Sequence, residues 1–371
     1  MVNAGTVLFF VSAVFGAIAV FLARSGHLGK EHLVGIDLGT TYSVVAVNRH
    51  GNVTVMPDVH GHLLLPSVVA FKPNGAEAAL YDFPLLANTT GDSHVCFGLN
   101  LPGHPSCISP VDIGYYVVKA LKETAMAFLG HDQVPGFGTF CLVRVCVTET
   151  CPDASQRKAT VAAFERAGLK VRNVLVEPTA AALAYGLHTK PNVHYVLVFD
   201  FGGGTLDVSL LYLQNGSFQV MDTAGDNHLG GREPPTSGDM PDVFPCTAAG
   251  VRGVAEQLKR RLSFANDGEA SCVVQQAVGE YVVGDTLRLR MTRAEWEELC
   301  LPTLQRTMEP VKEVLVGNMM TAGDVDEVVL VGGSSRIPWI QGQLTEMFGR
   351  APNGHIDPDV AVAVGAARLA H

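Results

Sequence analysis

One pattern occurs twice in this chain: a run of β-forming residues ends at an Asp and a glycine turn, and a second β-forming run follows. The first copy spans residues 34–47 and the second spans residues 196–211. The runs are apolar and rich in β-branched residues, which predicts buried strands, and the short turns between them predict hairpins. Two copies of the same unit predict two structurally related halves.

The turn residues are suited to binding a polyphosphate. Glycine has no Cβ, so its backbone N–H group can approach an anion closely, and threonine hydroxyls add further donors. The aspartates would repel phosphate directly, and they are therefore interpreted as outer-sphere holders of Mg²⁺, which bridges the two negative partners. A lone glycine triplet is usually only a hairpin turn, but two matched copies favour a metal and nucleotide site. The residues concerned are Asp37, Gly39, Thr40, Thr41, Asp200, Gly202, Gly203, Gly204, Thr205 and Asp207.

A third glycine turn follows the apolar run at residues 328–331. It reads Gly-Gly-Ser-Ser and leads into a predicted helix that opens near Pro338, a residue favoured in the first turn of helices. The unpaired N–H groups and positive dipole end of a helix N-terminus suit a nucleotide.

Residues 254–264 predict a helix with a polar stripe. Glu256, Lys259, Arg260 and Ser263 are spaced so that they share one face of that helix. Considered alone, such a stripe is a solvated face that carries a Glu–Lys ion pair. Its position after the second hairpin favours instead a role beside the nucleotide.

These segments resemble the ATPase domain of the heat-shock 70 kDa protein family, which has the actin-like fold. The resemblance implies an α/β protein, an actin-like ATPase fold of two related lobes with a nucleotide cleft between them. Lobe I is expected at residues 31–187 and lobe II at residues 188–371, each with a shortened outer subdomain. ATP or ADP and Mg²⁺ are the implied cofactors. The matching segments are residues 36–47, 155–187, 196–211, 223–231, 256–263, 328–338 and 357–367.

The resemblance assigns roles position by position. It implies that four residues act in hydrolysis, namely Asp37, Glu177, Asp200 and Thr205, and that hydrated Mg²⁺ is held by Asp37, Asp200 and Asp207. It implies that the nucleotide is bound by Gly39, Thr40, Thr41, Tyr42, Gly202, Gly203, Gly204, Gly230, Gly231, Glu256, Lys259, Arg260, Ser263, Gly332, Gly333, Ser334, Arg336 and Asp359. From the residues alone, Glu177 just before Pro178 is expected in a loop, and the alternative is a helix-capping acid.

The chain departs from the family pattern at groups used for hydrolysis and signalling. The family lysine that positions the attacking water has no counterpart, because Lys72 lies too early, and Glu149 stands where the family has a proline that relays nucleotide state. Four prolines within residues 232–250 argue against a long helix there. Since ground-state contacts are retained, the expected function is ATP binding with weak or impaired hydrolysis. The alternative is a non-hydrolysing nucleotide-binding or scaffold protein that recruits partners.

Residues 1–30 are interpreted as a signal peptide or a membrane anchor, because residues 4–23 form an uncharged, largely apolar run that predicts a hydrophobic helix. The layout is similar to the microsomal member of the family that lacks a peptide-binding domain. This similarity favours the endoplasmic reticulum, with a lumenal or anchored protein. The alternative is the cytosolic face of a membrane, which the basic residues after the run favour.

The net charge bears on which partners the protein can bind, and the cysteines bear on whether it carries disulfides or a zinc site. A net charge of −10 argues against nucleic acid, whose recognition needs a basic stripe. Co-chaperones or nucleotide-exchange factors are the protein partners that the resemblance implies, and the membrane is contacted only through the N-terminal segment. The eight cysteines show no disulfide or zinc signature, although Cys96 and Cys107 can pair across the shortened loop.

Overall fold

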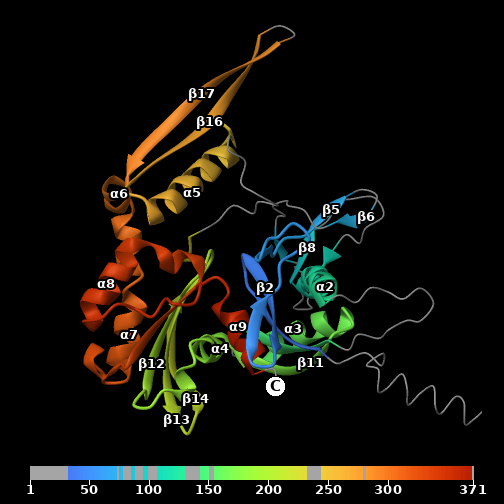
Figure 1. The fold of residues 1–371 in the computed structure, drawn as a ribbon. Helices are drawn as coiled ribbons and strands as arrows, with labels where there is room; N and C mark the ends of the chain where they lie inside the picture. The colour runs from blue at the N-terminus through green and yellow to red at the C-terminus, as the bar shows by residue number, and fades with distance from the viewer. Residues whose placement is uncertain are drawn as a thin grey trace, which may run out of the picture.

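The computed structural model describes residues 32–72, 75–77, 85–87, 95–98, 107–129, 143–149, 154–231, 244–278 and 281–369. Two large sheets organise these residues, and helices lie on and between the sheets (Figure 1). Each sheet contains one of the two predicted hairpins. The hairpins and the mixed α/β content are therefore confirmed.

The first sheet has the strand order β11-β10-β1-β2-β3, and β4 pairs with β2. β1 runs antiparallel to β2, as expected for a hairpin, and parallel to β10, which runs parallel to β11. Helices α2 and α3 cover one face of this sheet. The bounds are β1 His32–Leu38, β2 Tyr42–Arg49, β3 Asn52–Val55, β4 Leu65–Pro66, β10 Val143–Glu149, β11 Lys170–Val176, α2 Pro110–Leu129 and α3 Ala154–Arg166.

Both faces of the first sheet are buried by alternate residues of β2. Val45 and Val47 belong to a core shared with α2 and α3, whereas Val44 and Ala46 pack against α9, which spans Ala361–Arg368. Successive side chains of a strand point to opposite faces. A strand covered on both faces therefore reads as a continuous apolar run, as it does in this sequence.

The second sheet has the strand order β14-β13-β12-β18. β12 and β13 form the second hairpin, and β18 runs parallel to β12. Leu197 and Phe199 face a core with α7 and α8, whereas Val196 and Val198 face a core with α4 and α9. The bounds are β12 Tyr195–Phe201, β13 Leu206–Gln214, β14 Ser217–Asp226, β18 Glu327–Val331, α4 Glu177–Ala184, α7 Glu309–Gly317 and α8 Pro338–Phe348.

Helices α4 and α9 pack against each other between the two sheets (Figure 1). Small residues permit this packing. A Cβ at Gly365 of α9 would overlap the carbonyl oxygen of Ala180 in α4, and a Cβ at Gly35 of β1 would overlap backbone atoms of Ala363 and Ala367. The two halves are therefore joined by backbone-to-backbone contacts that leave no room for a methyl group.

A long hairpin and a helix form the outer part of the second half (Figure 1). Val254 and Leu258 of α5 pack on β16, and a disulfide joins Cys246 to Cys272 of β16. Sequence spacing does not predict this disulfide. α5 begins inside the segment where prolines argue against a helix, because Pro245, the last of them, precedes it. The bounds are β15 Phe244–Pro245, α5 Ala248–Phe264, β16 Asp267–Val278, β17 Tyr281–Thr292 and α6 Arg293–Arg306.

Short elements complete the described chain. The small strands β5 and β6 pair with each other, and β7, β8 and β9 form a separate small sheet. Three 3₁₀ helices lie in the second half or at its border. The bounds are β5 Ala70–Lys72, β6 Gly75–Glu77, β7 Leu85–Ala87, β8 Val95–Gly98, β9 Cys107–Ile108, η1 Leu187–Thr189, η2 Ala322–Asp324 and η3 Gly333–Arg336.

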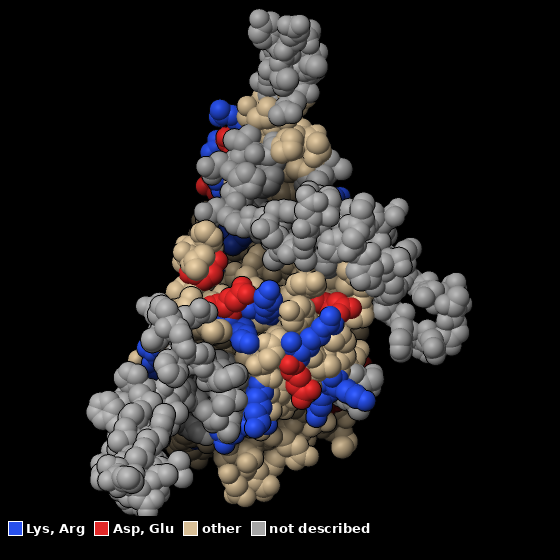
Figure 2. Space-filling model, turned by 90° about the vertical axis from the view of Figure 1, so that its right-hand side faces the viewer, with Lys and Arg blue, Asp and Glu red and all other residues tan. Residues whose placement is uncertain are grey.

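The face of the molecule that carries α2 and α3 is mixed in charge (Figure 2). Acidic side chains lie between the Lys and Arg side chains on this face. An ion pair joins Arg166 of α3 to Asp112 of α2, and Lys119 lies 4.0 Å from Glu123 one helical turn away. Exposed pairs of this kind contribute little stability, so the face is best described as a solvated surface.

Some predicted features lie outside the described residues. These are the N-terminal segment at residues 1–30 and the side chains of Lys72, Cys96, Cys107 and Glu149. Among the residues that the structure describes, no helix combines the length and the apolar character needed to cross a membrane.

Candidate functional site

The two predicted glycine turns lie against each other. The turn after β1 carries Thr40 and Thr41, and the turn after β12 carries Gly203 and Gly204. A Cβ at Gly203 would overlap the hydroxyl oxygen of Thr41, and a Cβ at Gly204 would lie 3.6 Å from the Cγ2 of Thr40. Both turns therefore border one cavity, which Gly39, Tyr42, Gly202 and Thr205 also line.

Carboxylates gather at the base of this cavity. Asp200 and Asp207 stand directly opposite each other in the β12–β13 ladder, so their side chains share one face. Burial raises the pKa of Asp200 well above its ordinary value, and the charges of Asp37, Asp207 and Asp359 raise it further. Burial also raises the pKa of Asp207, against the opposing effect of a hydrogen bond from Thr205. The ionised forms of these carboxyl groups are thus disfavoured beside the two glycine turns.

A hydrated Mg²⁺ fits this donor set. Burial and the neighbouring charges raise the pKa of Asp200, and a cation would offset both effects; carboxylate oxygens are the hard ligands that Mg²⁺ prefers. Within the described part of the chain, no group of three or more His, Cys, Asp or Glu side chains is placed to hold a metal ion directly. Contact through water molecules is the mode that the residues present allow.

Glu177 lies at the start of α4 and not in a loop. Its side chain borders the cavity although only 8% of the residue is exposed, and Pro178 occupies the first turn of the helix. The loop prediction was wrong because proline is compatible with the first helical turn. Glu177 is the acidic residue of the first turn of α4, where the positive end of the helix dipole favours its charge.

The third glycine turn packs against the second and is hydrogen-bonded to it. Gly332 has a φ of 74°, a conformation that favours glycine, and a Cβ there would overlap the carbonyl of Phe201 and lie 2.9 Å from Oδ1 of Asp200. The hydroxyl of Ser334 donates to the carbonyl oxygen of Gly202 at 2.9 Å. The strand β18 thereby brings Gly332, Gly333 and Ser334 to the same cavity, and α8 opens at Pro338 as predicted.

Gly230 and Gly231 pack closely against the second turn. A Cβ at Gly230 would overlap the carbonyl of Gly203 and the amide of Gly204. The amide of Gly231 donates to the carbonyl oxygen of Gly202 at 3.1 Å. Neither glycine is among the residues that line the first cavity, and the lack of a side chain at Gly230 lets the chain pass close to the turn.

A second cavity of about 320 Å³ adjoins the first, with Gly333, Ser334 and Asp359 in the walls of both. Lys259, Arg260 and Ser263, which belong to the polar stripe of α5, line this second cavity.

Glu256 is the exception in the stripe. It is buried and does not line the cavity, and its carboxylate pairs with the ammonium of Lys259 at 2.7 Å. Lys259 also donates to the carbonyl oxygen of Gly231 at 3.1 Å. Glu256 and Gly231 together hold the Lys259 ammonium at the cavity wall.

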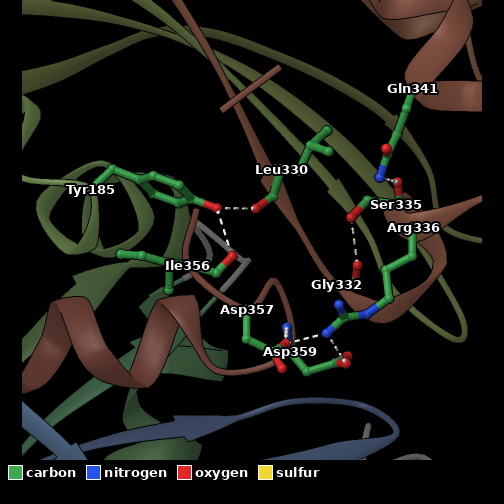
Figure 3. A network of polar contacts seen from close by, with 9 residues as sticks. All are labelled: Tyr185, Leu330, Gly332, Ser335, Arg336, Gln341, Ile356, Asp357 and Asp359. Carbon is green, nitrogen blue, oxygen red and sulfur yellow. Dashed lines mark hydrogen bonds and ion pairs between the residues drawn. The ribbon is translucent and has the colours of Figure 1, made fainter. Parts of the chain in front are cut away.

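Arg336 is held by two carboxylates at the edge of the second cavity (Figure 3). Its guanidinium pairs with Asp357 and lies 2.9 Å from Oδ2 of Asp359. Burial lowers the pKa of Arg336, but the hydrogen bond and charge of Asp359, aided by Asp357, outweigh burial and raise that pKa. The guanidinium is therefore fixed in its charged form beside the cavity.

Sequence reasoning missed three residues that line the second cavity: Phe264, Ile337 and Asp357. Asp357 carried a usable signal, because it stands two residues before Asp359 in an Asp-Pro-Asp sequence. Phe264 directly follows Ser263, the last predicted residue of the stripe, but an apolar residue at that position reads as ordinary helix surface.

A buried tyrosine links the helix α4 to the segment that carries Asp357 (Figure 3). The hydroxyl of Tyr185 donates to the carbonyl oxygens of Leu330 at 3.1 Å and Ile356 at 3.3 Å, and burial raises the pKa of Tyr185 to about 12.

Tyr185→Phe leaves both carbonyl oxygens without this donor, so we expect the free energy of unfolding to fall by about 1–2 kcal/mol in chemical denaturation. Tyr212→Phe, a partly exposed tyrosine on β13, is the matched control, and equal losses in both variants would contradict the role of the Tyr185 hydroxyl.

Comparison with known proteins agrees with this geometry. The family model described as Hsp70 protein matches residues 33–80, 86–234 and 247–371. The chaperone protein DnaK of Thermosipho melanesiensis is 35% identical over 363 residues, which is 91% of this chain and 59% of that relative. The chain thus spans less than two thirds of the length of the curated relative that it matches. Since the family model covers most of the described residues and both hairpins, the chain belongs to the Hsp70 family.

Proposed function

We propose that this protein binds Mg-ATP in the paired cavities and hydrolyses it slowly, as a chaperone-like member of the Hsp70 family. The single observation that carries the proposal is the contact between the two Asp-bearing glycine turns, with Gly203 against Thr41 beside a cluster of half-buried carboxylates. Donors for phosphate and carboxylates for a divalent cation occur together there. A cavity with both is suited to a metal-bound polyphosphate.

The residues divide between the two ends of a nucleotide. Thr40, Thr41, Thr205 and the amides of the glycine turns would bind the phosphates. Asp37, Asp200 and Asp207 would hold Mg²⁺ through water, and the ion would supply charge neutralisation between carboxylates and phosphates. The second cavity, walled by Lys259, Arg260, Ser263 and Arg336, would take the adenosine. Its volume of about 320 Å³ suits a ligand of that size.

We propose slow hydrolysis because the residues suited to binding are retained, whereas residues that the family uses for the chemical step and for signalling are not. The glycine turns and the carboxylates line the first cavity, and Lys259, Arg260 and Arg336 line the second. The family lysine has no counterpart in the sequence, and Glu149 stands where the family has a proline. Loss of a group that acts only in the transition state lowers the rate and leaves ground-state binding intact.

A non-hydrolysing nucleotide-binding protein that recruits partners is the second candidate. The same two departures, at the family lysine and at Glu149, favour it. It differs from the first candidate only in the chemical step, so a rate measurement separates the two.

Thermal unfolding with Mg-ATP, Mg-ADP and ATP plus EDTA tests binding. Ligand at a hundred times its Kd stabilises the folded state by about 2.7 kcal/mol, so we expect the Tm to rise by about 5 °C with either Mg-nucleotide and by much less with EDTA. Single-turnover hydrolysis tests the chemistry, with Asp200→Asn as the reference. No thermal shift under any condition would contradict both candidates, and equal turnover by wild type and variant would leave only the second.

The endoplasmic reticulum remains the proposed location, lumenal or anchored through residues 1–30, with the cytosolic face as the alternative. The Cys246–Cys272 disulfide supports an oxidising compartment, where such bonds persist. Similarity to the microsomal member of the family called Stch, and the engagement of co-chaperones or nucleotide-exchange factors, stay predictions. Protease protection of the protein in sealed microsomes would distinguish the lumenal from the cytosolic location.

A further inference from the structure

Phe264 is an exposed aromatic residue at the mouth of the second cavity. It is the last residue of α5, it lines the cavity, and 77% of it is exposed to solvent. A single exposed apolar residue is common on protein surfaces and needs no explanation by itself. Phe264 differs from such residues because its position is fixed and its neighbours are cationic.

The last turn of α5 is held firmly although its final side chain is exposed. Arg293 of α6 donates from Nε to the carbonyl oxygen of Leu262 at 2.7 Å and from Nη2 to that of Ala265 at 2.9 Å. These two carbonyls flank Phe264 on both sides. The exposure of the ring is therefore not that of a frayed helix end, because the backbone that carries it is clamped by a side chain of the next helix.

The walls of the second cavity suit a flat aromatic ligand. Arg260 lies four residues before Phe264, so both side chains extend from the same face of α5, and Arg336 stands across the cavity on η3. Guanidinium groups and aromatic rings both stack on nucleobases. Buried Ile337 adds an apolar surface to the cavity wall. The cavity thus offers cations and apolar surface together, and its one aromatic ring among the described lining residues is Phe264.

We infer that Phe264 is a specificity-determining residue that stacks on the base of the bound nucleotide and favours purines. The inference deepens the proposed function and rests on it. A purine presents a larger face to the ring than a pyrimidine does, so the contact strengthens the binding of ATP more than the binding of CTP or UTP. The phenyl ring has only two side-chain torsions, so little conformational entropy is lost when the base orders it.

Phe264→Ser tests the stacking contact, with Val251→Ser as the matched control. Val251 is also an exposed apolar residue of α5, with 52% exposure, but it lies at the opposite end of the helix and lines neither cavity. We expect Phe264→Ser to weaken Mg-ATP binding about tenfold in calorimetry and to narrow the preference for ATP over CTP. Mg-ribose 5′-triphosphate, which lacks a base, should bind wild type and variant equally. Val251→Ser should change none of these affinities.

Phe264→Trp provides a readout that a purely structural role would not produce. The indole should retain Mg-ATP affinity, and its emission should change when ATP binds but not when Mg-ribose 5′-triphosphate binds. Background emission from Trp296 and Trp339 is measured with the wild-type protein under the same titrations.

The outcomes separate this inference from the proposed function. If the wild-type protein binds Mg-ATP and Phe264→Ser binds it equally well, the stacking role is overturned and the proposed function stands. If Phe264→Ser weakens ATP and the base-free triphosphate by the same factor, the ring acts through the fold and the stacking role is again overturned. If the wild-type protein binds no nucleotide, both the proposed function and this inference fail.

Discussion

Replacing Gly365 by alanine is expected to lower the free energy of unfolding by about 3 kcal/mol or more, or the Tm by roughly 6 °C. A Cβ at this position in α9 would overlap the carbonyl oxygen of Ala180 and approach its Cα to 3.0 Å. Gly365 and Ala180 are both buried. The atoms that the Cβ would meet belong to the backbone of α4, which cannot rotate away as a side chain could. The helices must separate to accept the methyl group, which opens the packing that joins the two sheets.

Gly342→Ala is the matched control for this prediction. Gly342 lies within helix α8, and a Cβ there meets no atom within 4 Å. Alanine has the higher helix propensity, so this variant should gain about 0.5–1 kcal/mol in chemical denaturation. Opposite signs for the two variants would confirm that Gly365 is required by close packing, and a Gly365→Ala protein as stable as wild type would show that α4 and α9 do not pack as described.

The same packing connects stability to the site. α4 begins at Glu177, which borders the first cavity, and α9 begins two residues after Asp359, which borders both cavities. A variant that forces these helices apart therefore moves cavity walls that belong to both sheets. For this reason Gly365→Ala should weaken Mg-ATP binding as well as stability, whereas Gly342→Ala should leave binding unchanged.

The hairpins and their turns were predictable because their determinants are local. Each pair of strands carries its own apolar run and its own glycine turn, and both faces of β2 and β12 are covered, which the unbroken apolar runs indicate. The polar stripe of α5 was predictable for the same reason, since residues three and four apart share a helix face. Duplication predicted two related halves, and the family resemblance implied one cleft between them; in the structure Gly203 lies against Thr41.

Features that depend on long-range packing were not predictable. The Cys246–Cys272 disulfide needs β16 to lie beside the start of α5, which no cysteine spacing reveals. Glu256 shares the stripe with Lys259, yet the stripe pattern does not show that Glu256 is buried beneath it. Phe264 becomes informative only once Arg293 is seen to clamp the turn that carries it. Each of these contacts joins segments whose proximity is set by the tertiary fold.

Asp200→Asn is expected to stabilise the protein in the absence of metal and nucleotide and to abolish its stabilisation by Mg-ATP. Asp200 is half-buried, and its partial burial and the charges of Asp37, Asp207 and Asp359 act in the same direction, so the folded state disfavours the ionised carboxylate. Asparagine keeps the shape without the charge. At pH 7 with EDTA we expect a gain of about 2 kcal/mol in the free energy of unfolding.

The raised pKa of Asp200 also predicts how the stability of the protein changes with pH. A carboxyl whose pKa is raised on folding stabilises the folded state at low pH, and that contribution is lost as the pH rises through the raised pKa. With EDTA, the Tm of the wild-type protein should therefore fall more steeply above about pH 4 than the Tm of Asp200→Asn. With saturating Mg-ATP at pH 7 the wild-type protein should instead be the more stable of the two, because the cation compensates its carboxylates and the variant has lost one of them.

Asp326→Asn is the control. Asp326 lies outside both cavities and accepts hydrogen bonds from the backbone amides of His194 and Tyr195 at 2.7 and 2.8 Å. The Asp326→Asn variant should lose the same stability with and without Mg-ATP. An Asp200→Asn protein that is less stable than wild type in EDTA would show that the Asp200 carboxylate is compensated within the chain itself, and the need for a cation at these turns would disappear.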